Sequence, residues 1–370
     1  MKNIPLVNVK VQFAQIQAEA EKQVLEILRT GAYILGQHNK AFETELAEYV
    51  GAQYAIPVKS GTDALLVALR AAGIQPGDEV ITTPFTFIAT AEAIRYLGAT
   101  PVFVDIEPDS YCIDVAQIEQ KITSKTKAIL PVHLFGHAAD VGAIDAIAQK
   151  HNLLVIGDAC QSIGTEYQGR PIGGLCAAEC YSFYPTKNLG GCGEGGAVTT
   201  NDPEFADRVR ILRAHGMRET YKHETIGYNM RLDEIQCAIL RLKLPKLRGW
   251  TRRRQEIAGI YTAAFQSVPG LQTPAVQAYS NHIYHQYTLL AENRTALQKY
   301  LKDSGVGTAV HYPIPLNLQP AFADLQQGPG SFPVAESVAA KIFSIPVYPE
   351  LTDEDIAYIV EKVKTGAQLS

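Results

Sequence analysis

The 370-residue sequence lacks the features that mark several classes of protein. No apolar run is long enough to span a membrane, and the chain begins with polar sequence instead of an apolar leader, so we expect a cytoplasmic protein with no membrane partner. Net charge is only −5 and the pI is near 6.0, which argues against nucleic acid as a partner. A composition that is 46% hydrophobic and 19% charged excludes a disordered chain.

Cysteine and histidine are sparse, and their spacing is not that of a disulfide framework or a metal site. None of the six cysteines forms a C-x-x-C motif, and a chain of this size needs no disulfides, so we expect free thiols in a reducing compartment. His133 and His137 in "HLFGH" have no third ligand at a telling spacing, so no metal is predicted. One basic stretch, Arg241 to Arg254, carries seven cations and no acid, and it is typical of a solvated helix face.

From about residue 50, short strand and helix patterns alternate along the chain. Strands are predicted at Tyr54 to Val58, Glu79 to Thr83, Pro101 to Val104, Lys127 to Val132, Leu153 to Gly157, Glu179 to Phe183 and Ala197 to Thr200. Helical patterns lie between several of them, for example at 63–72 and 141–150. This alternation predicts a mostly parallel sheet with helices on both faces, and ligands of such sheets collect at the carboxyl ends of the strands.

The pattern divides the chain into three parts. Residues 1–30 are predicted to form a helical segment that packs on a large domain of residues 31–250. Residues 251–370 form a smaller C-terminal α+β domain, with helices expected around 251–265, 293–304 and 353–366 and a proline-rich passage between them.

A single lysine stands out in "SFYPTKNLGGCGEGGA", Ser182 to Ala197. Lys187 lies between an aromatic and proline stretch and a glycine-rich loop, where a surface lysine is not usual. Taken alone, it could be an ordinary lysine in a turn. A lysine among apolar groups loses part of its preference for the charged form, which suits a nucleophile.

Three other motifs lie at predicted strand ends. "SGTDALLVALRAAG" opens a helix directly after a strand; Gly61 permits close backbone approach to an anion, and the hydroxyls of Ser60 and Thr62 could bond a phosphate or cap the helix. Asp158 ends a strand, where it could cap a helix or pair with a protonated ring nitrogen. Phe85 and Phe87 follow another strand, either as core or as a stacking aromatic.

Together these residues describe a site for pyridoxal 5′-phosphate (PLP). The phosphate would lie at the helix N-terminus, Asp158 would face the ring nitrogen and Phe87 would stack on the ring. Lys187 would form a Schiff base with the aldehyde. The turn at Ser60 has the spacing of neither the Walker loop nor the dinucleotide fingerprint, so it indicates a phosphate without a nucleotide-binding fold.

From "YILG" at Tyr33 to "HYPIPLNLQP" at His311, the sequence resembles the DegT/StrS group of PLP-dependent nucleotide-sugar aminotransferases. The resemblance implies an α/β fold of the aspartate aminotransferase type (fold type I), with a large domain built on a mostly parallel seven-stranded sheet and a smaller C-terminal domain. It also implies a homodimer with shared active sites.

The resemblance implies roles for individual residues. Lys187 matches the Schiff-base lysine and Asp158 the partner of the pyridinium nitrogen. The other matching cofactor contacts are Gly61, Thr62, Phe87, Gln161, Ser182 and, reaching the phosphate of the neighbouring subunit, Asn229. Tyr184, His311 and Tyr312 match positions that meet the sugar substrate. Lys59 departs from the pattern, because a small or uncharged residue is expected before "SGTDAL".

The implied reaction has two halves. An amino donor, expected to be glutamate, loads the cofactor, which then aminates a keto group of a nucleotide-linked sugar. Lys187 argues against the sugar dehydratases of this superfamily, which carry histidine there. Tyr184, three residues before the lysine, favours amination at C3, whereas Glu194 is common among C4 enzymes. Amination at C4, amination of an inosose cyclitol and a non-catalytic regulatory role remain the alternatives.

Overall fold

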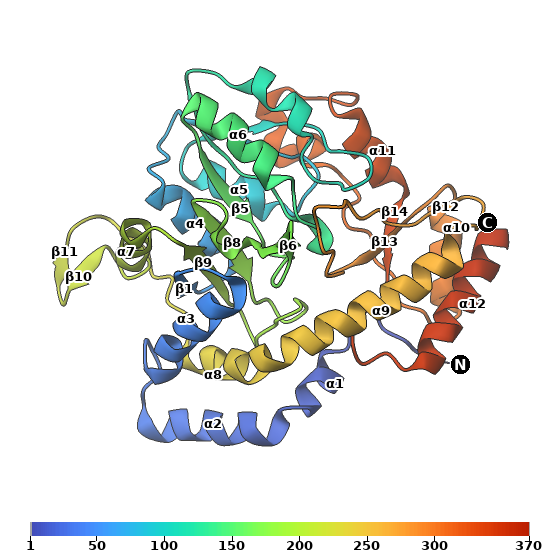
Figure 1. Cartoon of the computed structure of the whole chain (residues 1–370), viewed down its shortest axis with the longest axis horizontal. Helices are drawn as coiled ribbons and strands as arrows, with labels where there is room; N and C mark the ends of the chain where they lie inside the picture. Colours follow the sequence, from blue (N-terminus) through green and yellow to red (C-terminus); the bar gives the residue numbers. More distant parts are fainter. Residues whose placement is uncertain (1, 370) are drawn as a thin grey trace.

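The computed structural model describes residues 2–369 and is built around one seven-stranded sheet (Figure 1). The strand order is β1-β9-β8-β5-β4-β2-β3, with β9 antiparallel to both of its neighbours and the other pairs parallel. The strands are β1 (Tyr54–Val58), β2 (Glu79–Thr82), β3 (Thr100–Phe103), β4 (Thr126–Ile129), β5 (Leu154–Asp158), β8 (Ala178–Ser182) and β9 (Gly196–Thr200).

All seven predicted strands form, and the expected mostly parallel α/β sheet is confirmed. Strand β4 ends at Ile129, earlier than predicted, because Pro131 has no N–H to continue the ladder. The strands are largely buried on both faces, which explains why they read as short apolar runs.

Helices cover both faces of the sheet. One layer packs its apolar side chains against residues such as Ile56, Val80 and Val198 and consists of α4 (Gly61–Ala71), α5 (Ala89–Tyr96) and α7 (Pro203–Leu212). The opposite layer consists of α3 (Gln37–Val50), α6 (Val141–His151) and α8 (Glu234–Lys243). Alternate strand residues therefore enter opposite cores, as the two-residue strand period requires.

The N-terminal and C-terminal segments pack beside this body. The helical segment predicted for residues 1–30 contains α1 (Val9–Ala14) and α2 (Gln17–Thr30), and Ile16 and Ala20 pack on Ile239 of α8. The C-terminal part holds α10 (Arg294–Asp303), α11 (Pro333–Lys341), α12 (Asp353–Leu369) and the antiparallel strands β12 (Leu271–Gln272), β13 (Tyr287–Ala291) and β14 (Ile342–Ile345). The long helix α9 (Leu247–Phe265) runs through the proposed domain division at residue 250 (Figure 1).

The basic stretch is not the solvated helix face that its composition suggested. It spans α8 and α9, where Lys243 and Arg254 are buried and Arg241 pairs with Glu45. The Lys243 amine donates to the carbonyl of Gly190 at 2.6 Å and to Gln12 at 3.0 Å. The composition was misleading because a run of like charges does not reveal which side chains the helix turns toward the core.

A small hairpin projects from the body at the left of Figure 1. It consists of β10 (Met217–Glu219) and β11 (Lys222–His223). The side chain of Tyr221 in its turn is 90% exposed, and that of Ile226, just after β11, is 85% exposed. We call residues 217–228 the arm. In the part of the chain that the structure describes, no helix is both long and apolar enough to cross a membrane, and the six cysteines are free.

Candidate active site

A cavity of about 510 Å³ opens where β1, β2, β5 and β8 end. Every cofactor and substrate residue predicted from the sequence lines it except Asn229, which lies outside: Gly61, Thr62, Phe87, Asp158, Gln161, Ser182, Tyr184, Lys187, His311 and Tyr312. These residues come from segments far apart in the chain, and the carboxyl-end location is that expected for a ligand site on a mostly parallel sheet.

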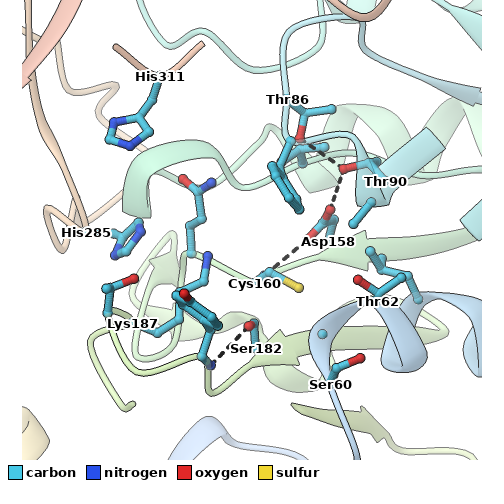
Figure 2. A pocket seen from close by; sticks show the side chains of 18 of the residues that line it. Ser60, Thr62, Thr86, Thr90, Asp158, Cys160, Ser182, Lys187, His285 and His311 are labelled. Atoms are coloured by element: carbon cyan, nitrogen blue, oxygen red, sulfur yellow. Dashed lines mark hydrogen bonds between the residues drawn. The ribbon is translucent and has the colours of Figure 1, made fainter. Parts of the chain in front are cut away.

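Lys187 projects into this cavity from the turn after β8 (Figure 2). Its backbone N–H donates to the carbonyl of Tyr184 at 2.8 Å, which closes the turn. The glycine-rich sequence is needed here because a Cβ on Gly190 would lie 2.3 Å from the carbonyl oxygen of Pro185. Burial lowers the pKa of Lys187, and the nearby Cys160 and Asp158 partly offset that effect. A larger fraction of the amine is therefore neutral and nucleophilic than in water.

The turn before α4 brings backbone N–H groups to the same cavity. Ser60 caps the helix, since its hydroxyl oxygen accepts from the N–H of Asp63 at 3.0 Å. A Cβ on Gly61 would lie 2.7 Å from the Cβ of Ser182, so only glycine lets the helix N-terminus approach β8 this closely. Thr62 and Ser182 complete this end of the cavity, whereas Lys59 is exposed and is not part of the lining. The arrangement suits an anion.

Asp158 is 5% exposed and is held by two donors. The Thr90 hydroxyl donates to Oδ2 at 2.7 Å and the Cys160 N–H to Oδ1 at 3.1 Å, while Thr86 lies 3.0 Å from the Thr90 hydroxyl (Figure 2). Turns follow Asp158, so its interpretation as a helix cap is wrong. Sequence reasoning missed both threonines, although their four-residue spacing in "TFIAT" was a visible signal.

Gln161 links the sheet to the C-terminal part of the chain. Its amide nitrogen donates to the Tyr312 hydroxyl at 2.9 Å, and its carbonyl oxygen accepts from the Phe135 N–H at 2.9 Å. The Phe87 ring lies 6.2 Å from the ring of Tyr312 and is 55% exposed, so it can present a face to a planar ligand. Phe85 is fully buried, which decides in favour of a core role for that residue.

Two histidines lie on the side of the cavity nearest Lys187 (Figure 2). His311 was predicted; His285 was not, although "HIYHQY" was available as a signal. The Nδ1 of His285 lies 3.2 Å from the side-chain oxygen of Asn188, within hydrogen-bond distance. Burial and the charges of Lys187 and Arg254 hold the pKa of His285 well below its usual range. Burial also lowers the pKa of His311. Both rings are therefore neutral near pH 7.

The donor set fits PLP. An anion-binding helix N-terminus, a buried carboxylate, a desolvated lysine and an exposed aromatic ring surround one cavity. Those four groups match the phosphate, the ring nitrogen, the aldehyde and the ring face of that cofactor.

Comparison with known proteins identifies the family. The model of the DegT/DnrJ/EryC1/StrS aminotransferase family matches residues 14–364. The chain belongs to this family. Two relatives cover it almost completely: a "Pleiotropic regulatory protein" of Geobacillus stearothermophilus, 47% identical over 98% of each chain, and a "UDP-N-acetyl-3-dehydro-alpha-D-glucosamine 3-aminotranferase" of Acidithiobacillus ferrooxidans, 44% identical over 98% of this chain and 97% of the relative.

A solved structure gives the same result. The "X-ray crystal structure of S. venezuelae DesV in complex with ketimine intermediate" superposes with a TM-score of 0.97 at 40% identity, over 100% of this chain and 99% of the other. The predictions of a type I fold, of PLP as cofactor and of aminotransferase activity are therefore confirmed. The roles of the individual residues stay predictions.

Proposed function

We propose that this enzyme transfers an amino group from glutamate to the C3 keto group of a nucleotide-linked deoxy sugar. The observation that carries the proposal is the position of Lys187 and Asp158 in one cavity whose remaining wall holds Tyr184, His311 and Tyr312. That cavity, about 510 Å³, has room for a sugar beside the cofactor. The name of the Acidithiobacillus relative, that of a nucleotide-sugar 3-aminotransferase, supports the same substrate class.

Different residues of this chain would have different roles in the reaction. Bound PLP supplies an electron sink for the carbon that loses a proton. Lys187, whose pKa is lowered by burial, would accept that proton at Nζ and release it again within the cavity. Asp158, fixed by Thr90 and the Cys160 N–H, keeps the ring nitrogen protonated. Gln161, fixed by its hydrogen bond to Tyr312, would contact the ring hydroxyl.

The choice between C3 and C4 of the sugar depends on two residues that line the cavity, Tyr184 and Glu194. Tyr184 is 47% exposed there, and a tyrosine three residues before the lysine favours C3. Glu194 lines the same cavity and favours C4, so C4 amination is the alternative, together with an inosose cyclitol as acceptor.

A panel of acceptors tests the position. The purified protein, loaded in its pyridoxamine phosphate form, should react with 3-keto nucleotide sugars at least about tenfold faster than with 4-keto isomers or an inosose, a discrimination of the size that one well-placed polar contact gives. Absorbance of the cofactor and the mass of the product measure the reaction. Faster reaction of a 4-keto sugar would place the amino group at C4.

A simpler observation distinguishes an enzyme from a non-catalytic regulatory protein. The Geobacillus relative is named a regulatory protein, but the chain described here keeps Lys187, Asp158 and the anion-binding turn in one cavity. We expect the protein to become visibly coloured with PLP and to lose that colour with an amino donor. A colourless protein that binds no PLP would favour the non-catalytic role.

We infer that the active site is shared between two copies of the chain. Asn229 lies at the base of the arm, outside the cavity of its own chain, where its exposed side chain accepts a hydrogen bond from Arg231. The arm also exposes Tyr221 and Ile226, large apolar side chains that a second copy would cover. In a symmetric dimer, Asn229 of each copy would reach the phosphate in the other.

Subunit mixing tests this inference. Asn229→Asp would put like charge beside the cofactor phosphate, so we expect weak cofactor retention with little loss of fold. Mixing this variant with Lys187→Ala should restore activity at limiting cofactor to about a quarter of wild type, for statistical exchange and independent sites. Each mixed dimer would hold one site with Lys187 and Asn229 both intact. Proven exchange without any return of activity would show that Asn229 does not act across an interface.

A further inference from the structure

A second, smaller cavity adjoins the site. Its volume is about 120 Å³, and it shares Thr186, His285, Gln286 and His311 with the large cavity. The rest of its wall comes from the N-terminal segment, from α9 and from the segment after β14: Leu6, Val7, Arg254, Val347 and Tyr348. The two cavities therefore meet at the histidine side of Lys187.

Arg254 is the unexplained residue of this smaller cavity. It is only 4% exposed, and its Nη1 donates to the carbonyl oxygens of Tyr284 at 3.2 Å and Val347 at 2.6 Å. Its Nε has no hydrogen-bond partner among residues 2–369. The neighbouring Arg253 pairs with Glu256 and Asp353, but no carboxylate of the described chain lies within ion-pair distance of Arg254.

The local acids do not neutralise this guanidinium. Glu350, the acid that acts on it most, accepts a hydrogen bond from Gln15 instead. Burial lowers the pKa of Arg254 to about 10, so the group is still charged near pH 7. A buried charge whose acids all lie beyond ion-pair distance is poorly compensated, and Arg254 lines a cavity that adjoins the site, so a ligand there could supply the negative charge.

The size and the walls of the cavity restrict that ligand. The cavity, about 120 Å³, has less than a quarter of the volume of the large one, which favours a small ligand group there. Leu6, Val7 and Val347 offer apolar contacts beside the cation. A short methylene chain that ends in a carboxylate fits this combination.

We propose that Arg254 binds the distal carboxylate of a dicarboxylic amino donor, with Leu6, Val7 and Val347 around its methylene groups. The proposal rests on the proposed aminotransferase function and concerns the donor half of the reaction. The α-carboxylate is one bond from the reacting carbon and stays in the large cavity beside Lys187. The side-chain carboxylate extends past Thr186 and His285 into the small one.

The donor half-reaction tests the proposal without any sugar. Stopped-flow absorbance of the PLP-loaded enzyme gives the specificity for L-glutamate relative to L-alanine, which lacks the second carboxylate. Wild type should prefer glutamate, and Arg254→Gln should lower that ratio about tenfold or more, because it removes a charge-assisted contact made only by glutamate. The matched control is Arg252→Gln on the exposed part of the same helix, for which the ratio should not change. Equal loss with both donors would overturn the assignment.

A binding experiment tests the subsite without the reaction, and a second variant covers the case in which Arg254→Gln does not fold. Isothermal titration calorimetry of the holoenzyme with glutarate, a dicarboxylate that cannot transaminate, should show binding that butyrate lacks. Val7→Phe narrows the cavity from a partly exposed segment while leaving Arg254 in place, and it should weaken glutarate about tenfold or more. Unchanged glutarate binding in both Val7→Phe and a folded Arg254→Gln would refute the subsite.

The two proposals fail separately. If wild type transfers amino groups but takes alanine as readily as glutamate, the subsite is wrong and the aminotransferase function stands. If neither amino acid changes the cofactor spectrum but glutarate still binds through Arg254, the subsite stands and the donor reaction is wrong.

Discussion

Lys187→Ala is expected to fold normally and to lose turnover by at least about 10⁴-fold, because one group both binds the cofactor covalently and carries the proton. The fold should tolerate the change. Burial lowers the pKa of this amine, so the charged form is disfavoured where it lies and its removal should not destabilise the fold. Thermal unfolding of the apo protein and steady-state turnover measure the two effects.

Chemical trapping gives the same experiment a positive readout. Borohydride reduction of the PLP-loaded wild type, followed by peptide mapping, should place the cofactor on Lys187 alone. Lys59→Ala is the matched control, since Lys59 is exposed, lies beside the anion-binding turn and does not line the cavity. A label on Lys59 or on another lysine would contradict the assignment.

Asp158→Asn is the second substitution for which we expect a large loss of turnover. The amide is the same size, its oxygen can still accept from the Cys160 N–H, and its NH2 group can donate to the Thr90 hydroxyl, which can turn its own proton toward Thr86, so the fold and the turn after β5 should persist. A neutral amide cannot keep the ring nitrogen protonated, and we expect turnover to fall on the order of 10²-fold or more, the range for loss of one electrostatic stabiliser.

The comparison of both half-reactions sharpens this result. Each half needs the same protonated ring, so donor and acceptor rates should fall together, as measured by single-turnover absorbance. Asp145→Asn, on the exposed side of α6, is the control for a surface charge change. Near-normal turnover of Asp158→Asn would reduce Asp158 to a residue that closes a turn.

Local sequence patterns were sufficient to predict the main sheet and several residues of the cavity. The seven strands were readable because each is a short apolar run bounded by turn residues, and the alternation with helices determined the sheet type. Lys187, Asp158 and the turn at Gly61 were readable because each lies at the end of a strand or shortly after it, and the ends of such strands meet at one edge. Sequence neighbours alone thus predicted the lysine, the carboxylate and the turn that the structure brings into one cavity.

The tertiary structure decided what depends on distant partners. Thr90 is 68 residues from the Asp158 it holds, and Gln161 is 151 residues from Tyr312. Arg254 belongs to a run of cations that looks uniformly solvated, yet α9 turns this side chain inward against Val347, while Arg252 stays exposed. Periodicity shows which residues share a helix face, but packing against other segments decides which face is buried, and a buried charge acquires its meaning only from the groups that surround it.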